Sequence, residues 1–305
     1  MTRGTIGVLA MAYGTPRDRD DIAAYYTDIR RGRPPEPAQL EELTARYDAL
    51  GGTFPLRAIT AAQVAGLQRA FDAEVPGDYR VVLGQKHAAP TIEEGVAELA
   101  ARGIRRAVGI VLAPHFSAFS VGQYAERALH AQPDVAVVNV ESWATLPAYV
   151  DFLAAAVRAA LRQLPAGSEV VFTAHSLPAR ILDSGDPYPM QVAATAGAVA
   201  RAADLGGAWS TAWQSAGRTP EPWLGPDVLD VLRSRAAGGA PGVCICACGF
   251  TGDHLEVAYD LDIEAAAVAR EAGLPFARTA SMNDDPSVLC ALAQTVHERA
   301  VTATW

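Results

Sequence analysis

The chain has 305 residues, of which 50% are apolar and 19% are charged, which is typical of a globular protein and excludes a disordered or fibrous one. Its net charge of −9 argues against nonspecific binding to nucleic acid. No apolar run approaches the roughly 20 residues that a membrane-spanning helix needs, so we predict no stable membrane insertion.

Short apolar runs alternate with longer helical patterns along the whole chain. The predicted strands cover residues 5–12, 79–83, 107–113, 135–140, 169–173, 208–213 and 243–248. The predicted helices cover residues 20–30, 37–50, 59–71, 92–102, 147–164, 188–203, 226–236 and 286–303. The strands are almost continuously apolar, which is typical of parallel strands covered on both faces. The pattern predicts an α/β protein with doubly wound parallel sheets.

A second series of strand–helix units begins around residues 141–147, without a low-complexity linker. We predict two similar Rossmann-like lobes, 1–145 and 146–284, with a C-terminal helix at 285–305 that packs on the first lobe. The apolar run that starts the chain, with its triplet Ala10-Met11-Ala12, also imitates a secretion signal. Its length fits a buried strand equally well, and we interpret it as a strand of a cytoplasmic protein. No long heptad pattern stands out, so we predict a monomer.

Three of the four cysteines, Cys244, Cys246 and Cys248, alternate along one predicted strand and would point to one face. Together with Cys290 they could hold a metal or an iron–sulfur cluster. Their C-x-C-x-C spacing, however, matches neither the zinc-ribbon nor the ferredoxin pattern. Free cysteine is among the most buried residue types, which favours a core role in a reducing compartment.

Polar and aromatic residues follow several predicted strands, at the edge where ligands of such sheets bind. Four of the six histidines lie within eight residues after a strand: His87, His115, His175 and His254. Tyr13 follows the first strand. A lone histidine at a strand end is more often structural, but several together favour one shared functional cleft.

The stretch DHLEVAYDLDIE places Glu256, Asp260 and Glu264 four residues apart, with His254 beside them. On one helical face these side chains repel one another by a few tenths of a kcal/mol per pair. The row is either a solvated acidic face, as most charge runs are, or a row of oxygen ligands and proton acceptors that faces a cation. The spacing alone leaves both interpretations open.

Common nucleotide-binding and hydrolase motifs are missing from the sequence. No G-x-G-x-x-G follows the first strand, no G-x-x-x-x-G-K-[ST] occurs, and Ser176 in AHSLP is not part of a G-x-S-x-G elbow. Imidazole, carboxylate and phenol groups remain, together with clustered arginines and aromatic rings that could cover a flat ligand. These groups suit proton removal, handling of a divalent metal and binding of a carboxylated substrate.

Nine stretches, in order over nearly the whole chain, carry a resemblance to a known family: MAYGTP, YYTDIRRGRPPEP, RYDALGG, KHAAP, LAPHFSAFSVGQY, AHSLP, GDPYP, WQSAGRTPEPWLGPDV and GFTGDHLEVAYDLDIEA. The chain resembles the ferrochelatases, nearest to the soluble, coproporphyrin-using type of Gram-positive bacteria. The resemblance implies the fold of the type II chelatases. It also implies insertion of Fe²⁺ into a porphyrin in haem biosynthesis, with release of two protons. The arginines and the family branch favour coproporphyrin III over protoporphyrin IX.

The resemblance implies roles for individual residues. His175 matches the metal-site histidine, Glu256 its paired carboxylate, and Tyr13 the tyrosine on the loop that covers the macrocycle, and we predict these three as catalytic. In the family the acidic line leads to the metal site and can hold a hydrated divalent ion such as Mg²⁺. The predicted metal ligands are His175, Glu256, Asp260 and Glu264. The predicted substrate-binding residues are Tyr13, Arg30, Arg31, Arg46, Lys86, His87, Trp213 and Ser215.

The sequence departs from the family pattern at two places. Phe54 stands where the family often has serine, and thiols replace a mostly aliphatic strand in VCICACGF. Some relatives hold a [2Fe–2S] cluster on differently spaced ligands, and we predict no cluster here. The alternatives are a cobalt or nickel chelatase for another tetrapyrrole and a noncatalytic porphyrin or haem carrier. A carrier would need aromatic walls and arginines but not a paired histidine and carboxylate.

Overall fold

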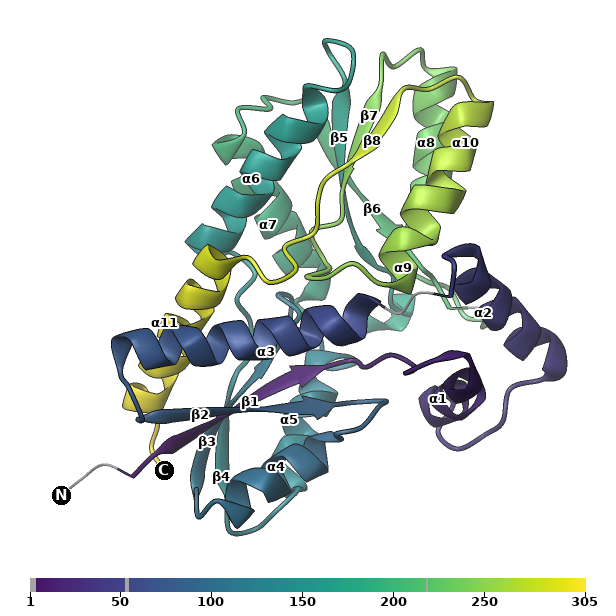
Figure 1. Cartoon of the computed structure of the whole chain (residues 1–305). Coiled ribbons are helices and arrows are strands. Elements are labelled where there is room, and N and C mark those ends of the chain that lie inside the picture. Colours follow the sequence, from purple (N-terminus) through teal and green to yellow (C-terminus); the bar gives the residue numbers. More distant parts are fainter. Residues whose placement is uncertain (1–3, 53–54, 218) are drawn as a thin grey trace. The chain divides into compact units, whose positions relative to one another are not determined.

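The computed structural model describes residues 4–52, 55–217 and 219–305, so that Phe54 lies outside the described residues. Its helices and strands form two compact units, each of which is visible in Figure 1. The first unit consists of Met1–Ala113, Ser120–Trp143 and Asn283–Trp305, and the second consists of Pro114–Phe119 and Ala144–Met282.

The first unit contains a four-stranded parallel sheet in the order β2-β1-β3-β4. Its strands are β1 (Ile6–Ala12), β2 (Tyr79–Gln85), β3 (Arg106–Val111) and β4 (Ala136–Val140). Its helices are α1 (Ile22–Ile29), which follows a 3₁₀ turn at Arg19–Asp21, α2 (Pro37–Ala49), α3 (Pro55–Glu74), α4 (Ile92–Ala101), α5 (Val121–His130) and α11 (Pro286–Thr302). In Figure 1, α3 and α11 lie together on one face of this sheet, and α4 and α5 lie on the other. Both faces of the strands are therefore buried.

The second unit repeats the same arrangement, with a parallel sheet in the order β6-β5-β7-β8. Its strands are β5 (Glu169–His175), β6 (Trp209–Gln214), β7 (Val243–Cys246) and β8 (Phe276–Arg278). Its helical elements are α6 (Pro147–Leu161), a 3₁₀ turn at Ala179–Ile181, α7 (Tyr188–Ala202), α8 (Val228–Ala237), α9 (Leu255–Ala258), a π-helix at Asp260–Ala265 and α10 (Ala266–Glu271). Figure 1 shows α6 and α7 on one face of the sheet, and α8 and α10 on the other.

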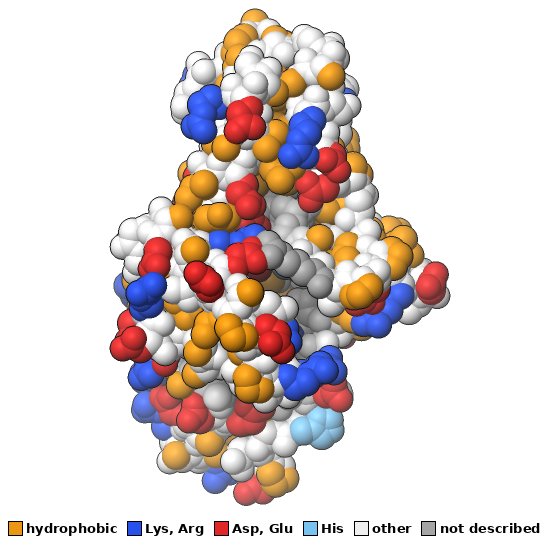
Figure 2. Space-filling model, turned by 90° about the vertical axis from the view of Figure 1, so that its right-hand side faces the viewer, with side chains coloured by type: hydrophobic (Ala, Val, Ile, Leu, Met, Phe, Trp, Pro, Cys, Tyr) orange, Lys and Arg blue, Asp and Glu red, His pale blue; other side chains and the backbone are white. Residues whose placement is uncertain are grey.

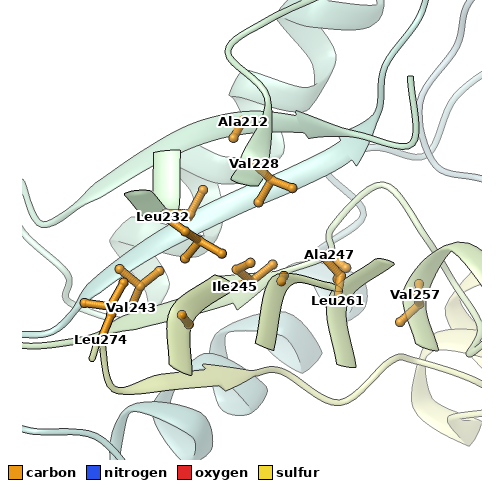
Figure 3. Close-up of a cluster of buried hydrophobic side chains, with 12 residues drawn as sticks. Ala212, Val228, Leu232, Val243, Ile245, Ala247, Val257, Leu261 and Leu274 are labelled. Atoms are coloured by element: carbon orange, nitrogen blue, oxygen red, sulfur yellow. The ribbon is translucent and has the colours of Figure 1, made fainter. Parts of the chain in front are cut away.

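One hydrophobic cluster connects the sheet of the second unit to the segment after β7. Val243, Ile245 and Ala247 contribute to this cluster from β7 and the residues just beyond it. Val257 and Leu261 reach it from the helical segment on that side, as Figure 3 shows. Each of these aliphatic side chains is almost fully buried, and full burial of one side chain stabilises the fold by about 1.5–3 kcal/mol. The cluster thus fixes the helical segment that carries the acidic residues.

Parallel, doubly wound α/β architecture is confirmed, and all seven predicted strands are present with ends within two residues of the prediction. Among the strands and α-helices, β8, α5 and α10 were not predicted. Strand β8 has only three half-buried residues at the edge of its sheet, too few for a periodic signal. Residues 121–130 and 266–271, which form α5 and α10, belong to none of the predicted elements.

Strand β7 ends at Cys246, so only Cys244 and Cys246 of the three alternating thiols lie in a strand. Cys248 follows in a turn, and all three side chains are fully buried. Burial raises the pKa of Cys244 and of Cys248 to about 12. These side chains are therefore neutral thiols that pack in the interior of the second unit.

Gly249 allows the chain beyond β7 to run against β5. A Cβ atom at this position would lie 2.5 Å from Cβ and 2.7 Å from Cα of Ala174, closer than real carbon atoms approach. We expect Gly249→Ala to lower the free energy of unfolding by about 1–3 kcal/mol, the usual cost of overpacking a core. Urea unfolding should be compared with Gly207→Ala, because a Cβ at Gly207 meets nothing within 4 Å. Equal stability of the two variants would contradict the prediction.

Within the part of the chain that the structure describes, no helix combines the length and the apolar character needed to cross a membrane. On the face drawn in Figure 2, acidic and basic side chains are interspersed with apolar ones. Among the exposed large apolar side chains, Leu129 lies on α5 and Met190 lies on α7.

Candidate active site

The order of strands in the second sheet creates a natural binding position. Chain order reverses between β6 and β7, which lie on either side of β5. Ligands of doubly wound sheets bind beyond the carboxyl ends of the strands at such a reversal. His175 is the last residue of β5, and Glu256 lies in α9, the first helix after β7. The fold therefore brings together two residues that are 81 positions apart in the sequence.

The His175 ring is held in one orientation by backbone groups. Its Nδ1 lies 2.5 Å from the carbonyl oxygen of Ser176 and donates a hydrogen bond to it. The hydroxyl of Tyr188 donates to the carbonyl oxygen of His175 itself, at 2.9 Å. Because Nδ1 carries the proton, Nε2 is the nitrogen that can accept a proton or bind a metal when the ring is neutral. This nitrogen faces the Oε1 atom of Glu256 at 3.4 Å.

Glu256 lies between two imidazole rings. Its Oε2 atom is 3.6 Å from Nε2 of His254, whose Nδ1 in turn donates to the carbonyl oxygen of Gly252 at 2.8 Å. The backbone of Glu256 is also fixed, because the Gln214 amide donates to its carbonyl oxygen at 2.8 Å. His254 was noted at the rim from the sequence but was not assigned to the site. Its position two residues before Glu256, just before a helix begins, could have indicated that His254 contacts this carboxylate.

The facing charges dominate the electrostatics of this pair. Burial alone would lower the pKa of His175, but the charge of Glu256 and its hydrogen bond raise it to about 9. Burial alone would raise the pKa of Glu256, but His175 and His254 hold it well below its usual range. Imidazolium and carboxylate therefore face each other at neutral pH. His175 must lose its proton before Nε2 can serve as a base or as a metal ligand.

The acidic row does not follow one regular α-helix. Helix α9 ends at Ala258, and the π-helix Asp260–Ala265 follows, in which the amide of Glu264 donates to the carbonyl oxygen of Tyr259. This wider turn changes the angular spacing of side chains, so the predicted single α-helical face is wrong. π turns are rare and occur often at functional sites. Within the described ranges, no three His, Cys, Asp or Glu side chains are grouped so that they could hold a metal ion.

Asp260 is the buried member of the acidic row, with 7% of its surface exposed. The hydroxyl of Ser215 donates to its Oδ2 atom at 2.5 Å. Ser215 follows β6 and has a φ of 58°, a left-handed conformation that costs a residue other than glycine about 1–3 kcal/mol. Such strain persists where the surroundings enforce it, and here it directs the hydroxyl to a carboxylate. Glu264 is half-buried farther along the π-helix.

Trp213 is buried at the carboxyl end of β6. Its ring packs on Tyr188, with 5.5 Å between the ring centroids. Only 7% of Trp213 is exposed. The hydroxyl of Tyr188 contacts the backbone of His175, so this pair of rings packs next to His175. The prediction that Trp213 covers a flat substrate remains a prediction.

The first unit gathers Tyr13, Lys86 and His87 at the ends of β1 and β2. Backbone amides of Lys86 and His87 donate to the carbonyl oxygens of Ala12 and Tyr13, both at 2.9 Å. The rings of Tyr13 and His87 meet edge to face at 4.7 Å between centroids. Tyr13 is 42% exposed, the most exposed aromatic ring of this group. The strand ends thus present a phenol, an ammonium group and an imidazole together.

The ammonium group of Lys86 is held close to aromatic rings. Its Nζ atom donates to Oε1 of Gln123 at 2.7 Å and lies 5.2 Å from the ring centroid of Tyr124. Burial lowers the pKa of Lys86 to about 8, and the charges of Arg127 and Arg31 contribute to the same direction. A carboxylate ligand would restore the full charge of this lysine.

The end of helix α1 contacts His87 and leads directly to Arg30 and Arg31. His87 Nδ1 lies 2.7 Å from Oδ2 of Asp28, near the end of α1. Arg30 and Arg31 follow directly, and the guanidinium of Arg30 lies over the ring of Tyr26. Arg46 lies on α2, 3.5 Å from Glu42 on the same helix. The predicted substrate-binding residues of this unit thus lie just after β1, β2 and α1 and on α2, and their role remains a prediction.

His115 does not belong with the other strand-end histidines. It is 3% exposed, and its Nε2 atom lies 2.8 Å from Oγ1 of Thr195. Burial lowers the pKa of His115 to about 3, so the ring is neutral. Asp186 stabilises the same loop by accepting hydrogen bonds from the hydroxyl of Ser117 and the amide of Ala118. These residues hold the chain after β3 in the second unit and have a structural role.

Residues 5–300 match the sequence profile of the family described as Ferrochelatase. The chain is 42% identical to a coproporphyrin III ferrochelatase of Geobacillus kaustophilus, over 98% of this chain and 97% of the relative. It is 44% identical to a ferrochelatase of Thermus thermophilus, over 92% of this chain and 95% of the relative.

Solved structures with low sequence identity share the fold. The crystal structure of the sirohydrochlorin chelatase SirB from Bacillus subtilis subspecies spizizenii, in complex with cobalt, superposes with a TM-score of 0.57. Its sequence is 13% identical, and the match covers 97% of this chain and 96% of SirB. The expected fold of the type II chelatases is thereby confirmed.

Proposed function

The chain belongs to the ferrochelatase family, and from this membership we propose that it inserts Fe²⁺ into coproporphyrin III, with His175 and Glu256 as the central catalytic pair. It is a lyase of haem biosynthesis that places iron in a porphyrin. The observation that carries the assignment of residues is the 3.4 Å approach of Nε2 of His175 to Oε1 of Glu256 at the chain reversal of the second sheet.

The reaction requires both proton removal and metal delivery. A free-base porphyrin loses two pyrrole N–H protons when the metal enters, and its flat ring hides the nitrogen lone pairs. A neutral imidazole can accept one of these protons or bind Fe²⁺ through nitrogen, while a carboxylate favours a hydrated cation. His175 and Glu256 supply one group of each kind at the same place.

The raised pKa of His175, about 9, implies an order of events. In the free enzyme at neutral pH, this imidazole carries a proton and faces the Glu256 carboxylate. A ferrous ion that approaches Glu256 brings positive charge, and a nearby cation lowers the pKa of an imidazole. Proton release from His175 would therefore accompany arrival of the metal. Nε2 is then free to accept a pyrrole proton or to bind the iron.

The remaining acidic residues support delivery of the cation. Asp260 and Glu264 continue from Glu256 along the π-helix, and Asp260 is held by the hydroxyl of Ser215. We propose that these carboxylates bind a hydrated divalent ion, either Mg²⁺ or the incoming Fe²⁺, and that they accept the protons released from the porphyrin. Oxygen ligands and retained water are the usual environment of such hard cations.

The preference for coproporphyrin III rests on the basic groups of the first unit. Arg30, Arg31, Arg46 and Lys86 offer as many cationic side chains as coproporphyrin III has propionates, whereas protoporphyrin IX has two. Tyr13 is proposed as the residue that positions the ring. The coproporphyrin III ferrochelatases among the relatives support the same substrate.

Initial rates with the two porphyrins test this preference. Hydrogen bonds to charged groups contribute about 1.5–3 kcal/mol each, and partial exposure of the arginines reduces that gain, so we expect kcat/KM to be about tenfold higher for coproporphyrin III. Iron insertion should be followed under anaerobic conditions by the absorbance change of each porphyrin. Equal or reversed kcat/KM values would contradict the four-propionate assignment while leaving the iron chemistry intact.

Three further properties are part of this proposal. The enzyme acts as a monomer in the cytoplasm. It holds no [2Fe–2S] cluster, because the C-x-C-x-C spacing of Cys244, Cys246 and Cys248 does not match the ferredoxin pattern. Neither nucleic acid nor a membrane is required for the reaction.

A further inference from the structure

Arg278, on the edge strand β8, binds two carboxylates that lie on either side of the catalytic glutamate. Its Nε and Nη2 atoms donate to Oδ1 and Oδ2 of Asp262 at 2.7 and 2.8 Å, which is a bidentate pair. Its Nη1 atom donates to Oδ1 of Asp253 at 3.2 Å and to the carbonyl oxygen of Thr279 at 3.0 Å. The guanidinium thus uses all three of its nitrogens, and only 16% of the side chain is exposed.

The two carboxylates bound by Arg278 lie on either side, in the sequence, of the residues that we propose to act in catalysis. Asp253 immediately precedes His254, and Asp262 lies within the π-helix, so the residues between them include His254, Glu256 and Asp260. Ser281 adds a second contact to this side by donating from its hydroxyl to Oδ1 of Asp253 at 2.8 Å. One strand of the sheet therefore fixes both ends of the segment 253–262.

The same segment is held from the opposite edge of the sheet by β6. Gln214 donates to the carbonyl oxygen of Glu256, and Ser215 donates to the carboxylate of Asp260. Between these edges, Val257 and Leu261 are buried in the hydrophobic cluster of the second unit. The helical segment is therefore fixed at β6, at the core and at β8, where Arg278 forms ion pairs with both Asp253 and Asp262.

A short α-helix followed by a π turn has few hydrogen bonds of its own to define its position. Helix α9 contains four residues, too few to be stable in isolation. The position of the Glu256 carboxylate relative to Nε2 of His175 then depends on tertiary anchors. Displacement of a reacting group by about 1 Å can cost a hundredfold in rate, so such anchors affect catalysis without touching the substrate.

We propose that Arg278 is a positioning residue for iron insertion, which fixes Glu256 opposite His175 by binding Asp253 and Asp262 together. This inference rests on the proposed function of Glu256 and extends it to a residue outside the predicted site. A fork-shaped guanidinium is needed, because an ammonium group reaches one carboxylate at a time and cannot reproduce the bidentate pair.

Steady-state kinetics on Arg278→Ala and Arg278→Lys test the proposal. Loss of a residue that orients a catalytic group typically costs 10–100-fold in activity, so we expect kcat to fall by about tenfold or more in both variants. The KM for the porphyrin should be unchanged, because Arg278 contacts the segment 253–262, which carries the proposed metal-binding residues Glu256 and Asp260. If Arg278→Ala is too unstable to purify, Arg278→Lys keeps the charge and still removes the fork.

Added guanidinium compounds provide a readout that a merely structural role would not produce. A hollow of about 590 Å³, lined in part by Asp253, Asp262 and Arg278, opens beside this side chain and gives a small ion access. Methylguanidinium, below the concentrations that unfold the chain, should restore part of the kcat of Arg278→Ala. Methylammonium should not restore it, because it lacks the planar fork.

Arg235 is the matched control. Its Nε atom lies 2.9 Å from Oε2 of Glu169, at the start of β5 in the same unit, and both side chains are partly exposed. Arg235→Ala should keep the wild-type kcat and gain nothing from methylguanidinium. The inference fails if Arg278→Ala matches Arg235→Ala in kcat, or if the loss appears only as a lower Tm with a normal rate per folded molecule. Absence of chelation by the wild-type protein would instead overturn the proposed function and this inference with it.

Discussion

His175→Ala is expected to reduce the rate of iron insertion by about 100-fold or more, the range over which a positioned acid–base group contributes to catalysis. The substitution removes the nitrogen that faces Glu256 and leaves a carboxylate without its partner. Backbone contacts of residue 175 are retained, because the hydroxyl of Tyr188 binds its carbonyl oxygen and not its ring. We therefore expect a folded protein that still binds porphyrin.

Porphyrin fluorescence titration and anaerobic turnover separate binding from chemistry for this variant. His130→Ala is the matched control, since His130 is exposed on α5 and its Nδ1 atom lies 2.8 Å from the carbonyl oxygen of Glu126 on the same helix. The control should retain the wild-type turnover. Near-native turnover by His175→Ala would remove His175 from the mechanism.

Glu256→Gln is expected to change both the rate and its dependence on pH. In the wild-type protein the charge of Glu256 raises the pKa of His175 to about 9, so kcat/KM should increase as the pH rises toward that value and His175 loses its proton. Without the carboxylate, burial of the imidazole lowers its pKa. The acid limb of kcat/KM should therefore move to lower pH, while kcat falls by about 100-fold or more because metal delivery is lost.

The same pair predicts a change in stability with pH. A folded-state pKa of His175 above its unfolded value gives stability that is fully present below the unfolded pKa and is lost as the pH rises toward about 9. Glu256→Gln should remove this alkaline loss of stability.

The control for the pH–rate profile is Glu169→Gln, which alters the pair with Arg235. This variant should leave the pH–rate profile unchanged. An unshifted acid limb in Glu256→Gln would show that Glu256 does not set the pKa of His175.

The sequence could predict the fold because its apolar runs are strong local signals. Strand β1, for example, is buried over nearly all of its length, and its sequence shows this directly. Strand β8 could not be found in this way, because its three residues are paired at one edge only. The site follows the same rule. The strand-end rule placed His175 among four candidate histidines, and the family resemblance then singled it out.

The hydrogen-bond partners of the site residues could not be predicted from the sequence. The tautomer of His175 depends on the orientation of the Ser176 carbonyl, and the π turn depends on anchors such as the bond from Ser215 to Asp260. The spacing of Glu256, Asp260 and Glu264 predicted a regular helix, because periodicity reports side-chain polarity and not the hydrogen bonds that widen a turn. Arg278 carried no signal at all, since its partners are 16 and 25 positions away.

The identical strand order of the two sheets, β2-β1-β3-β4 and β6-β5-β7-β8, has an evolutionary consequence. The same chain path was used twice, and on the proposed assignment one copy recognises the substituents of the macrocycle while the other handles the cation. Mutations in one copy could then alter which tetrapyrrole is accepted without altering which metal is inserted. On this assignment, ring specificity and metal specificity can be changed separately by mutation.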